Sequence, residues 1–319
     1  MKKGITKILS ACVFAFVVFL AAGTQSKAAV NMGVKQTGAG SSYVDLAWDA
    51  QLGAGHYHTQ FSQDGKNWID MDNSSSPSES VYNLTQGASY YARVVAYKGS
   101  HYTGTHVMIG VSETAIVSTK PTEVSGLTQT AAGVNSVSMS WNASAGAASY
   151  VIYGYINYNW TQIGTSATNS ATITGVAATT STRFSVAAVK NVTGGTVTGD
   201  QCSGVEMKAI PIKVSRIAMQ YYWDSLKEAK YIWTDVNNAD GYQYEVKSAN
   251  GKKTYFRATS TNSYTYVKPF PRGIFVKARV RAYMTVGNKV YYGAWSPYTY
   301  HASSKKVTAK RSSNGKKIY

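Results

Sequence analysis

Cysteine is almost missing from this sequence, which has two in 319 residues, Cys12 and Cys202. Cys12 falls in the N-terminal leader described below, so one cysteine remains in the mature chain and an internal disulfide is excluded. A disulfide scaffold is excluded for the same reason, and stability must come from hydrophobic cores. Cys202 has two interpretations, as a buried small apolar side chain or as a partner in an intermolecular disulfide.

Long apolar runs are missing after the first 23 residues. The N-terminus reads "MKKGITK", then the apolar run "ILSACVFAFVVFLAAG", then the small residues of "SKA" at positions 26–28. This order is typical of an export signal peptide, which we expect over residues 1–28. The run is shorter than the roughly 20 residues of a membrane span. We therefore expect a secreted, extracellular or wall-associated protein whose mature chain does not cross a membrane.

Catalytic motifs are also missing. The sequence has no Gly-rich phosphate loop and no Gly-x-Ser-x-Gly nucleophile turn. Its fifteen acidic residues are scattered, which does not favour the paired carboxylates of a glycoside hydrolase. The sequence predicts a protein that is not an enzyme and that binds no nucleotide or other cofactor.

Histidine is rare but clustered, since four of the five histidines are His56, His58, His101 and His106. His56 and His58 flank Tyr57, so we expect both to point outward if the tyrosine is buried in a strand. With the other two at the same end of the unit, four imidazoles could hold zinc or copper. Their spacing matches no known ligand motif, so metal capture is a subsidiary hypothesis.

One motif occurs three times in the chain. It reads "WDAQLGAGHY" at 48–57, "WNASAGAASY" at 141–150 and "WTDVNNADGY" at 233–242. Each copy has Trp, five residues, Ala, two residues and Tyr, and the tryptophans lie 93 and 92 residues apart. Solenoid repeats are about 20 to 50 residues long. The longer period instead predicts three whole domains of about 100 residues.

Alternation on both sides of the motif predicts the class of these domains. Before the first tryptophan, "VDLAW" alternates apolar and small or polar residues, and the alternation resumes after the tyrosine. The other two copies behave in the same way, which indicates antiparallel strands with one buried face. The polar stretch 70–79, "DMDNSSSPSE", does not alternate and is predicted to be a loop.

These patterns resemble the fibronectin type III domain, in which a Trp closes the second strand and Ala and Tyr open the third. In "LTQGASYYARVVAY", Tyr90 matches the corner position of the sixth strand. The segment "SQDGKNW" is similar to a hairpin of bacterial members, and "GAWS" is similar to their last strand. The resemblance covers residues 31–303. The corner position holds Thr182 and Val276 in the later copies, so the corner hydrogen bond should be missing there.

The resemblance implies an all-β chain of three tandem β-sandwiches. We expect domain 1 at 30–120, domain 2 at 121–210, domain 3 at 211–303 and a basic disordered tail at 304–319. Pro121 and Pro211 mark short, stiff junctions, so the chain should be an elongated rod. The side chains expected in the cores are Trp48, Tyr57, Tyr90, Trp141, Tyr150, Trp233 and Tyr242.

Positive charge is concentrated in the last third of the chain. Residues 210–319 hold twenty Lys or Arg against five Asp or Glu, whereas residues 29–120 hold five against seven. In "KARVRAY", burial of the apolar residues would turn Lys277, Arg279 and Arg281 outward along one strand. The other cations expected beside them or in the tail are Lys252, Lys253, Arg257, Lys305, Lys306, Lys310, Arg311, Lys316 and Lys317.

This asymmetry favours a polyanionic partner. The hypothesis is a non-catalytic adhesion or structural rod, anchored through domain 3 and its tail to an anionic envelope or matrix polymer. The alternative is a carbohydrate-binding or spacer accessory of secreted polysaccharide-degrading enzymes. A third interpretation is that the charge only keeps the surface soluble. The sequence predicts no oligomeric state.

Overall fold

The computed structural model describes residues 29–99, 106–223, 225–302, 310–311 and 317–318. The predicted signal peptide at 1–28 lies outside these residues. The part of the chain that is described consists of β-strands, turns and irregular segments. None of its residues belongs to a helix that is long and apolar enough to cross a membrane.

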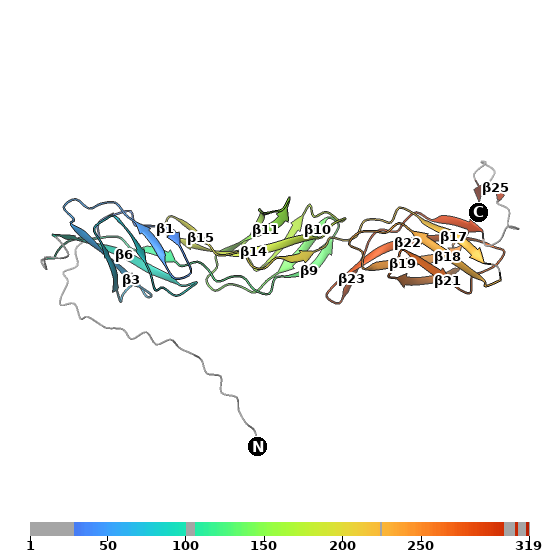
Figure 1. The fold of residues 1–319 in the computed structure, drawn as a ribbon, viewed down its shortest axis with the longest axis horizontal. Coiled ribbons are helices and arrows are strands. Elements are labelled where there is room, and N and C mark those ends of the chain that lie inside the picture. The colour runs from blue at the N-terminus through green and yellow to red at the C-terminus, as the bar shows by residue number, and fades with distance from the viewer. Residues whose placement is uncertain (1–28, 100–105, 224, 303–309, 312–316, 319) are drawn as a thin grey trace, which may run out of the picture.

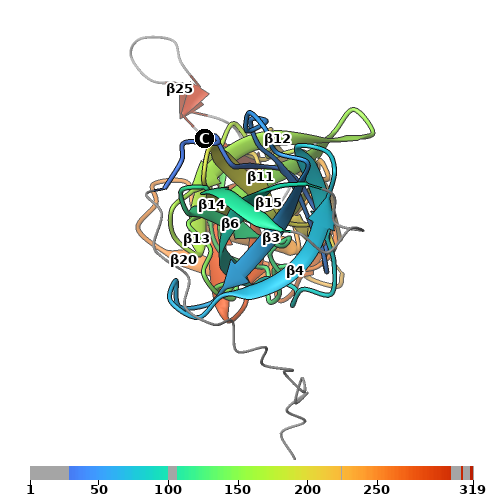
Figure 2. The same ribbon diagram turned by 90° about the vertical axis from the view of Figure 1, so that its left-hand side faces the viewer.

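Three β-sandwiches follow one another along the chain in an elongated arrangement (Figure 1). Viewed along the long axis, the three units lie behind one another (Figure 2). In domain 1 a sheet of order β1-β2-β5 packs on a sheet of order β4-β3-β6-β7, with β8 also paired to β6. Its strands are β1 (Lys35–Ala39), β2 (Val44–Ala47), β3 (His56–Ser62), β4 (Ile69–Ser74), β5 (Ser78–Val81), β6 (Ser89–Lys98), β7 (Val107–Val111) and β8 (Ala115–Ser118).

Domains 2 and 3 repeat this topology strand by strand. In domain 2 the strands are β9 (Thr128–Gly133), β10 (Ser136–Ser140), β11 (Ser149–Ile156), β12 (Asn159–Ser166), β13 (Ser170–Thr174), β14 (Thr182–Val192), β15 (Gly195–Thr198) and β16 (Val205–Met207). In domain 3 they are β17 (Ile217–Trp223), β18 (Glu228–Trp233), β19 (Gly241–Ser248), β20 (Thr254–Ser260), β21 (Tyr264–Val267), β22 (Phe275–Val286), β23 (Lys289–Tyr292) and β24 (Thr299–Ala302). Each unit is therefore a fibronectin type III-like sandwich, and the all-β prediction is confirmed.

The repeated motif builds the link between the second and third strands. In each copy the Trp and Tyr rings meet edge to face, with centroids 5.4, 5.3 and 5.5 Å apart. The tyrosine hydroxyl accepts the backbone N–H six residues upstream, at 3.0, 3.0 and 2.7 Å. The alanine N–H then closes the turn on that same upstream residue. The motif thus satisfies a tight turn and contributes two rings to each core, which explains why it recurs.

All seven predicted core side chains are buried, including Trp48, Trp141 and Trp233 at 5, 3 and 7 % exposure. In domain 1 the hydroxyl of Tyr90 accepts the N–H of Thr85 at 3.0 Å, which is the expected corner bond.

The last strand of each sandwich is split at a buried residue that bonds twice to the central strand. These residues are Ser112, Cys202 and Ser296. Each donates its N–H to a valine carbonyl at 2.7 to 3.0 Å and accepts the same valine N–H on its side chain, at 2.8 Å, 3.2 Å and 3.0 Å in chain order. The valines are Val94, Val186 and Val280. Cys202 thus lies where the other domains have serine, and the buried interpretation of this thiol is confirmed.

One local prediction is wrong. The stretch 70–79 is not a loop, because Ile69–Ser74 forms β4 and Ser78–Val81 forms β5. Strand β4 pairs with β3 at the edge of the larger sheet, where most of its side chains are exposed. An edge strand with both faces largely in water has no need of apolar alternation. Pairing with a partner strand, rather than its own composition, makes this polar segment extended.

Of the predicted tail, the structure describes β25 (Lys310–Arg311) and β26 (Lys317–Ile318), which pair as a short antiparallel ladder. These four residues therefore have regular backbone structure, unlike the disordered chain that their composition predicts. The remaining tail residues lie outside the described part of the chain.

Candidate functional site

Strand β22 carries the cationic stripe of domain 3. Val276, Ala278, Val280 and Ala282 are fully buried, so the residues between them face outward from the larger sheet. Across the ladder with β19, Lys277 lies opposite Lys247, Arg279 opposite Glu245 and Arg281 opposite Gln243. We call the cations Lys247, Lys252, Lys253, Arg257, Lys277, Arg279 and Arg281 the cationic face.

A buried carboxylate lies at the centre of this face. The side chain of Glu245 is fully buried although it is on the outer side of the sheet. Its Oε1 accepts from Arg279 Nε at 3.0 Å and from the Tyr298 hydroxyl at 3.0 Å. Lys247 Nζ lies 3.2 Å from the same oxygen, and Arg257 binds Oε2 through both Nε and Nη2. Desolvation disfavours the charged carboxylate, but hydrogen bonds from Arg257, Tyr298 and Lys247 outweigh it and lower the pKa of Glu245 to about 2.

Aromatic rings alternate with the cations of β22. The guanidinium of Arg279 lies 4.8 Å from the Tyr298 ring centroid and 4.3 Å from that of Trp295. The guanidinium of Arg281 lies 4.5 Å from Trp295 and 3.8 Å from Tyr292, and both its Nε and Nη2 donate to Gln243. Stacking and hydrogen bonding hold these guanidiniums in place. The stripe is therefore a fixed ladder of alternating charges and rings.

The other cations of the face differ in how far they reach into solvent. Lys252 and Lys253 lie in and after the turn between β19 and β20 and are exposed. The Arg257 side chain is 54 % exposed, against 23 % for Arg279 and 20 % for Lys247. The cations best placed to meet an external anion are therefore at the β20 edge, and those of β22 lie deeper.

Sequence reasoning missed Glu245, which organises the face, and could place Trp295 and Tyr298 near the cations without assigning them a role. The alternation of β19 put Glu245 on the outer side, but its place between two arginines depends on the register of three strands. Of the predicted tail cations, Lys305, Lys306 and Lys316 lie outside the described residues. Lys310, Arg311 and Lys317 belong to the β25-β26 ladder.

Three of the four domain 1 histidines come together, while His101 lies outside the described residues. His56 and His58 share the outer side of β3, with ring centroids 5.4 Å apart. His106 Nδ1 is 3.2 Å from His56 Nε2, and His56 Nδ1 is 2.9 Å from the Gly99 carbonyl. His56 is buried and stacked on Tyr97, so it does not point into solvent as expected. Among the described residues, no group of three His, Cys, Asp or Glu side chains is arranged to hold a metal ion.

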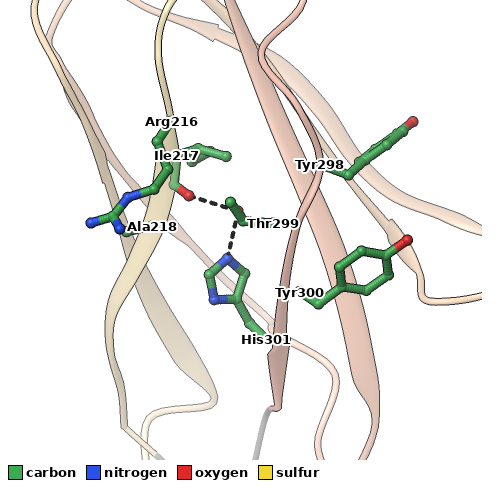
Figure 3. A pocket seen from close by; sticks show the side chains of 7 residues that line it. All are labelled: Arg216, Ile217, Ala218, Tyr298, Thr299, Tyr300 and His301. Atoms are coloured by element: carbon green, nitrogen blue, oxygen red, sulfur yellow. Dashed lines mark hydrogen bonds between the residues drawn. The ribbon is translucent and has the colours of Figure 1, made fainter. Parts of the chain in front are cut away.

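A shallow hollow of about 370 Å³ lies at the open edge of domain 3 (Figure 3). Strands β17 and β24 flank it, and His301 lies between them beside Thr299. The Thr299 hydroxyl donates to the Ile217 carbonyl at 2.6 Å, so the His301 Nε2–H donates to Thr299 Oγ1, at 2.9 Å. Desolvation, and then the charge of Arg216, lower the pKa of His301 to about 4. The Thr299 hydroxyl donates its proton to the backbone and not to His301, so this imidazole does not activate Thr299 as a nucleophile.

No family model and no curated protein matches the chain. Among solved structures, the chain is similar to the FN1–FN3 domains of chicken CNTN1, with 15 % identity and a TM-score of 0.34. That match covers 85 % of this chain and 97 % of the other. At this TM-score we draw nothing from the likeness, and the assignment of three fibronectin type III-like sandwiches rests on the strand order and register.

Proposed function

We propose that the chain is a secreted, non-catalytic rod that is anchored through domain 3 and its tail to an anionic envelope or matrix polymer. The observation that supports this most is the cationic face itself, in which three of the seven cations, Lys247, Arg257 and Arg279, pair with a single buried carboxylate. Domains 1 and 2 carry no such excess of positive charge. The apolar leader at 1–28 supports export.

The ladder suits this role because its cations are already ordered. Free lysine or arginine side chains lose rotamer entropy when they bind, which weakens each contact. Arg279 and Arg281 have lost that freedom in the folded protein, through Glu245, Gln243 and the stacked rings. Each exposed ion pair is worth less than about 1 kcal/mol and is screened by salt. A repeating polyanion adds many such contacts on one chain.

The test is sedimentation with purified cell wall, before and after its anionic polymers are extracted, across a series of NaCl concentrations. The triple variant K252Q/K253Q/R257Q should bind the untreated wall about tenfold more weakly at low salt. A matched triple variant, K213Q/K227Q/K268Q, loses the same charge from exposed positions outside the face and should bind nearly as the wild type does.

Three results would contradict the anchor: equal losses in both triple variants, binding that resists salt, or retention by a chain ending after domain 2. Salt-resistant binding to extracted wall would favour the carbohydrate-binding accessory instead.

A further inference from the structure

The outer face of the β17-β18-β21 sheet, on the opposite side of domain 3 from the cationic face, carries a cluster of aromatic rings around one lysine. Lys230 of β18 lies opposite Tyr221 of β17 and opposite Tyr266 of β21. Trp223 and Tyr264 are the next outward residues on the two flanking strands. We call Tyr221, Trp223, Lys230, Tyr264 and Tyr266 the aromatic patch.

The patch is open to solvent and its members touch. Trp223, Tyr264 and Tyr266 are 42, 42 and 50 % exposed. The Tyr221 and Trp223 ring centroids are 4.1 Å apart, and those of Tyr264 and Tyr266 are 6.0 Å apart. The Lys230 ammonium lies 5.7, 5.2 and 5.6 Å from the centroids of Tyr221, Tyr264 and Tyr266. A positive charge is thus ringed by apolar surface and phenolic hydroxyls.

The equivalent faces of the other two domains show that the fold does not require aromatic side chains at these positions. In domain 1 the matching positions hold Asp45 and Ser80, which bond to each other at 2.6 Å. In domain 2 they hold serines and threonines, such as Ser138 and Thr172 at 2.9 Å. At the positions of Lys230 and Tyr266, the other two copies of this sheet therefore carry short polar pairs instead of a lysine among aromatic rings. Exposed aromatic patches of this kind mark binding sites more often than chance surface.

The chemistry of the patch defines what it can recognise. The Lys230 ammonium can pair with an anionic group of a ligand. The aromatic rings around it can contact apolar C–H surface next to that group. Partial desolvation, and then a hydrogen bond with Tyr266, raise the pKa of Tyr221 to about 12, so this phenol stays neutral at physiological pH. An acidic sugar has both features on one ring, namely a carboxylate or sulfate and a C–H face. A flat outer face three strands wide suits an extended polymer, whereas peptides that join a sheet bind at its edge.

We propose that the aromatic patch binds a polysaccharide whose pyranose rings carry acidic groups, with Lys230 pairing to the acid and the tyrosine and tryptophan rings contacting the sugar faces. This site is separate from the cationic face, so it does not rest on the anchoring proposed above. The two sites lie on different sheets of domain 3, so each can be tested without the other.

The test is affinity electrophoresis of the full mature chain in native gels that contain alginate, dextran sulfate or polyphosphate. Trp223→Ala and Tyr266→Ala should weaken retardation by one of the two acidic polysaccharides about fivefold to tenfold. Retardation by polyphosphate, which has no sugar ring, should not change. Alginate and dextran sulfate separate carboxylate from sulfate recognition. Tyr266→Phe keeps the ring and should keep binding, and Tyr82→Ala, which removes a 56 % exposed tyrosine of domain 1, is the control.

Several results would overturn the proposal. The first is wild-type retardation of Trp223→Ala and Tyr266→Ala in both polysaccharides, at unchanged melting temperature. The second is that the neutral polymer hydroxyethylcellulose retards the protein as strongly as the acidic polymers do, through the patch, and that Lys230→Met does not change this retardation. The third is patch-dependent retardation by oligothymidylate alone, which would assign the patch to single-stranded nucleic acid. The fourth is concentration-dependent mobility without polymer that Tyr266→Ala abolishes, which would assign it to self-association. A loss of polyphosphate binding in K252Q/K253Q/R257Q reports on the cationic face alone.

Discussion

Glu245 shows how a single residue can decide the stability of a charged surface. Without it, Arg257, Arg279 and Lys247 would repel one another across three adjacent strands. With it, each of the three cations pairs with the Glu245 carboxylate, and together they shield that carboxylate from water. Removal of one member of a buried ion cluster leaves the other charges uncompensated. It therefore lowers the free energy of unfolding by more than the loss of a surface ion pair does.

We predict that Glu245→Gln destabilises domain 3 by about 3 kcal/mol at neutral pH. The folded pKa of Glu245, about 2, lies below the ordinary value of 4.5. The carboxylate therefore stabilises the fold above about pH 4.5, and this contribution is lost progressively as pH falls from there to about 2. Scanning calorimetry of both proteins at pH 7 and pH 3 measures the difference. The gap between wild type and variant should shrink at pH 3, and a gap that is the same at both values would contradict the assignment.

Cys202 gives a second prediction at this scale, because Ser112 and Ser296 form the same two bonds in the other domains. Cys202→Ser should change the stability of domain 2 by less than about 1 kcal/mol. Cys202→Ala removes the acceptor from the buried N–H of Val186 and should cost about 1 to 3 kcal/mol. Calorimetry of the two variants separates a hydrogen-bonding role from simple packing. Equal losses in both would show that the volume of sulfur, and not its bond, matters.

At the scale of elements, the turn between the second and third strands is the most regular feature of the molecule. The hydroxyls of Tyr57, Tyr150 and Tyr242 satisfy the same backbone N–H in the three domains. In domain 3 the tyrosine hydroxyl also donates to Asp235. Desolvation, and then the bond to Asp235, raise the pKa of Tyr242 to about 12. This hydroxyl therefore stays protonated and keeps both of its bonds at physiological pH.

We predict that Tyr57→Phe and Tyr150→Phe each cost about 1 to 2 kcal/mol, since a buried N–H loses its acceptor. Tyr242→Phe should cost more, because Asp235 loses a donor as well. Calorimetry should show each substitution moving the transition of one domain only. Tyr82→Phe, at an exposed position, is the control and should have no effect. Similar losses in all four variants would mean that the hydroxyls do not form these bonds.

The same elements show what the sequence could predict. The period of two and the Trp–Ala–Tyr spacing were enough for the strands, the cores and the number of domains, because each depends on neighbours in the chain. Strand β4 was missed because an exposed edge strand is defined by its partner and not by its own pattern. The outward stripe of β22 was predicted from alternation. Its stacking on rings, such as Arg281 on Trp295, and the aromatic patch were not, because these residues meet only through cross-strand register.

For the whole molecule, the junction of domains 1 and 2 is held by more than the linker. The ammonium of Lys190 is buried in the junction, and it donates to the Gly87 carbonyl of domain 1. Desolvation lowers the pKa of this lysine, as expected for a charge in a covered interface. Thr193 and Ile116 form two more hydrogen bonds across the junction. The Thr193 N–H donates to the Ile116 carbonyl at 2.8 Å, and the Ile116 N–H donates to the Thr193 hydroxyl oxygen at 2.7 Å. The junction of domains 2 and 3 has the ion pair of Lys208 and Asp240, which are 3.6 Å apart and whose side chains are 36 and 39 % exposed.

This difference predicts unequal stiffness along the rod. Lys190→Met keeps the apolar stem but removes the bond to Gly87, so domains 1 and 2 should tumble more independently. Lys208→Met removes a partly exposed ion pair at 3.6 Å, which is worth little, and should leave the second junction nearly as it is. Amide ¹⁵N relaxation measures the rotational diffusion of each domain in the intact chain. In the wild type, domains 1 and 2 should share one diffusion tensor, and Lys190→Met should split it. If neither substitution changes tumbling, then the linker prolines set the stiffness and the Lys190 bond contributes nothing to it. If both change tumbling equally, the predicted difference between the two junctions is wrong.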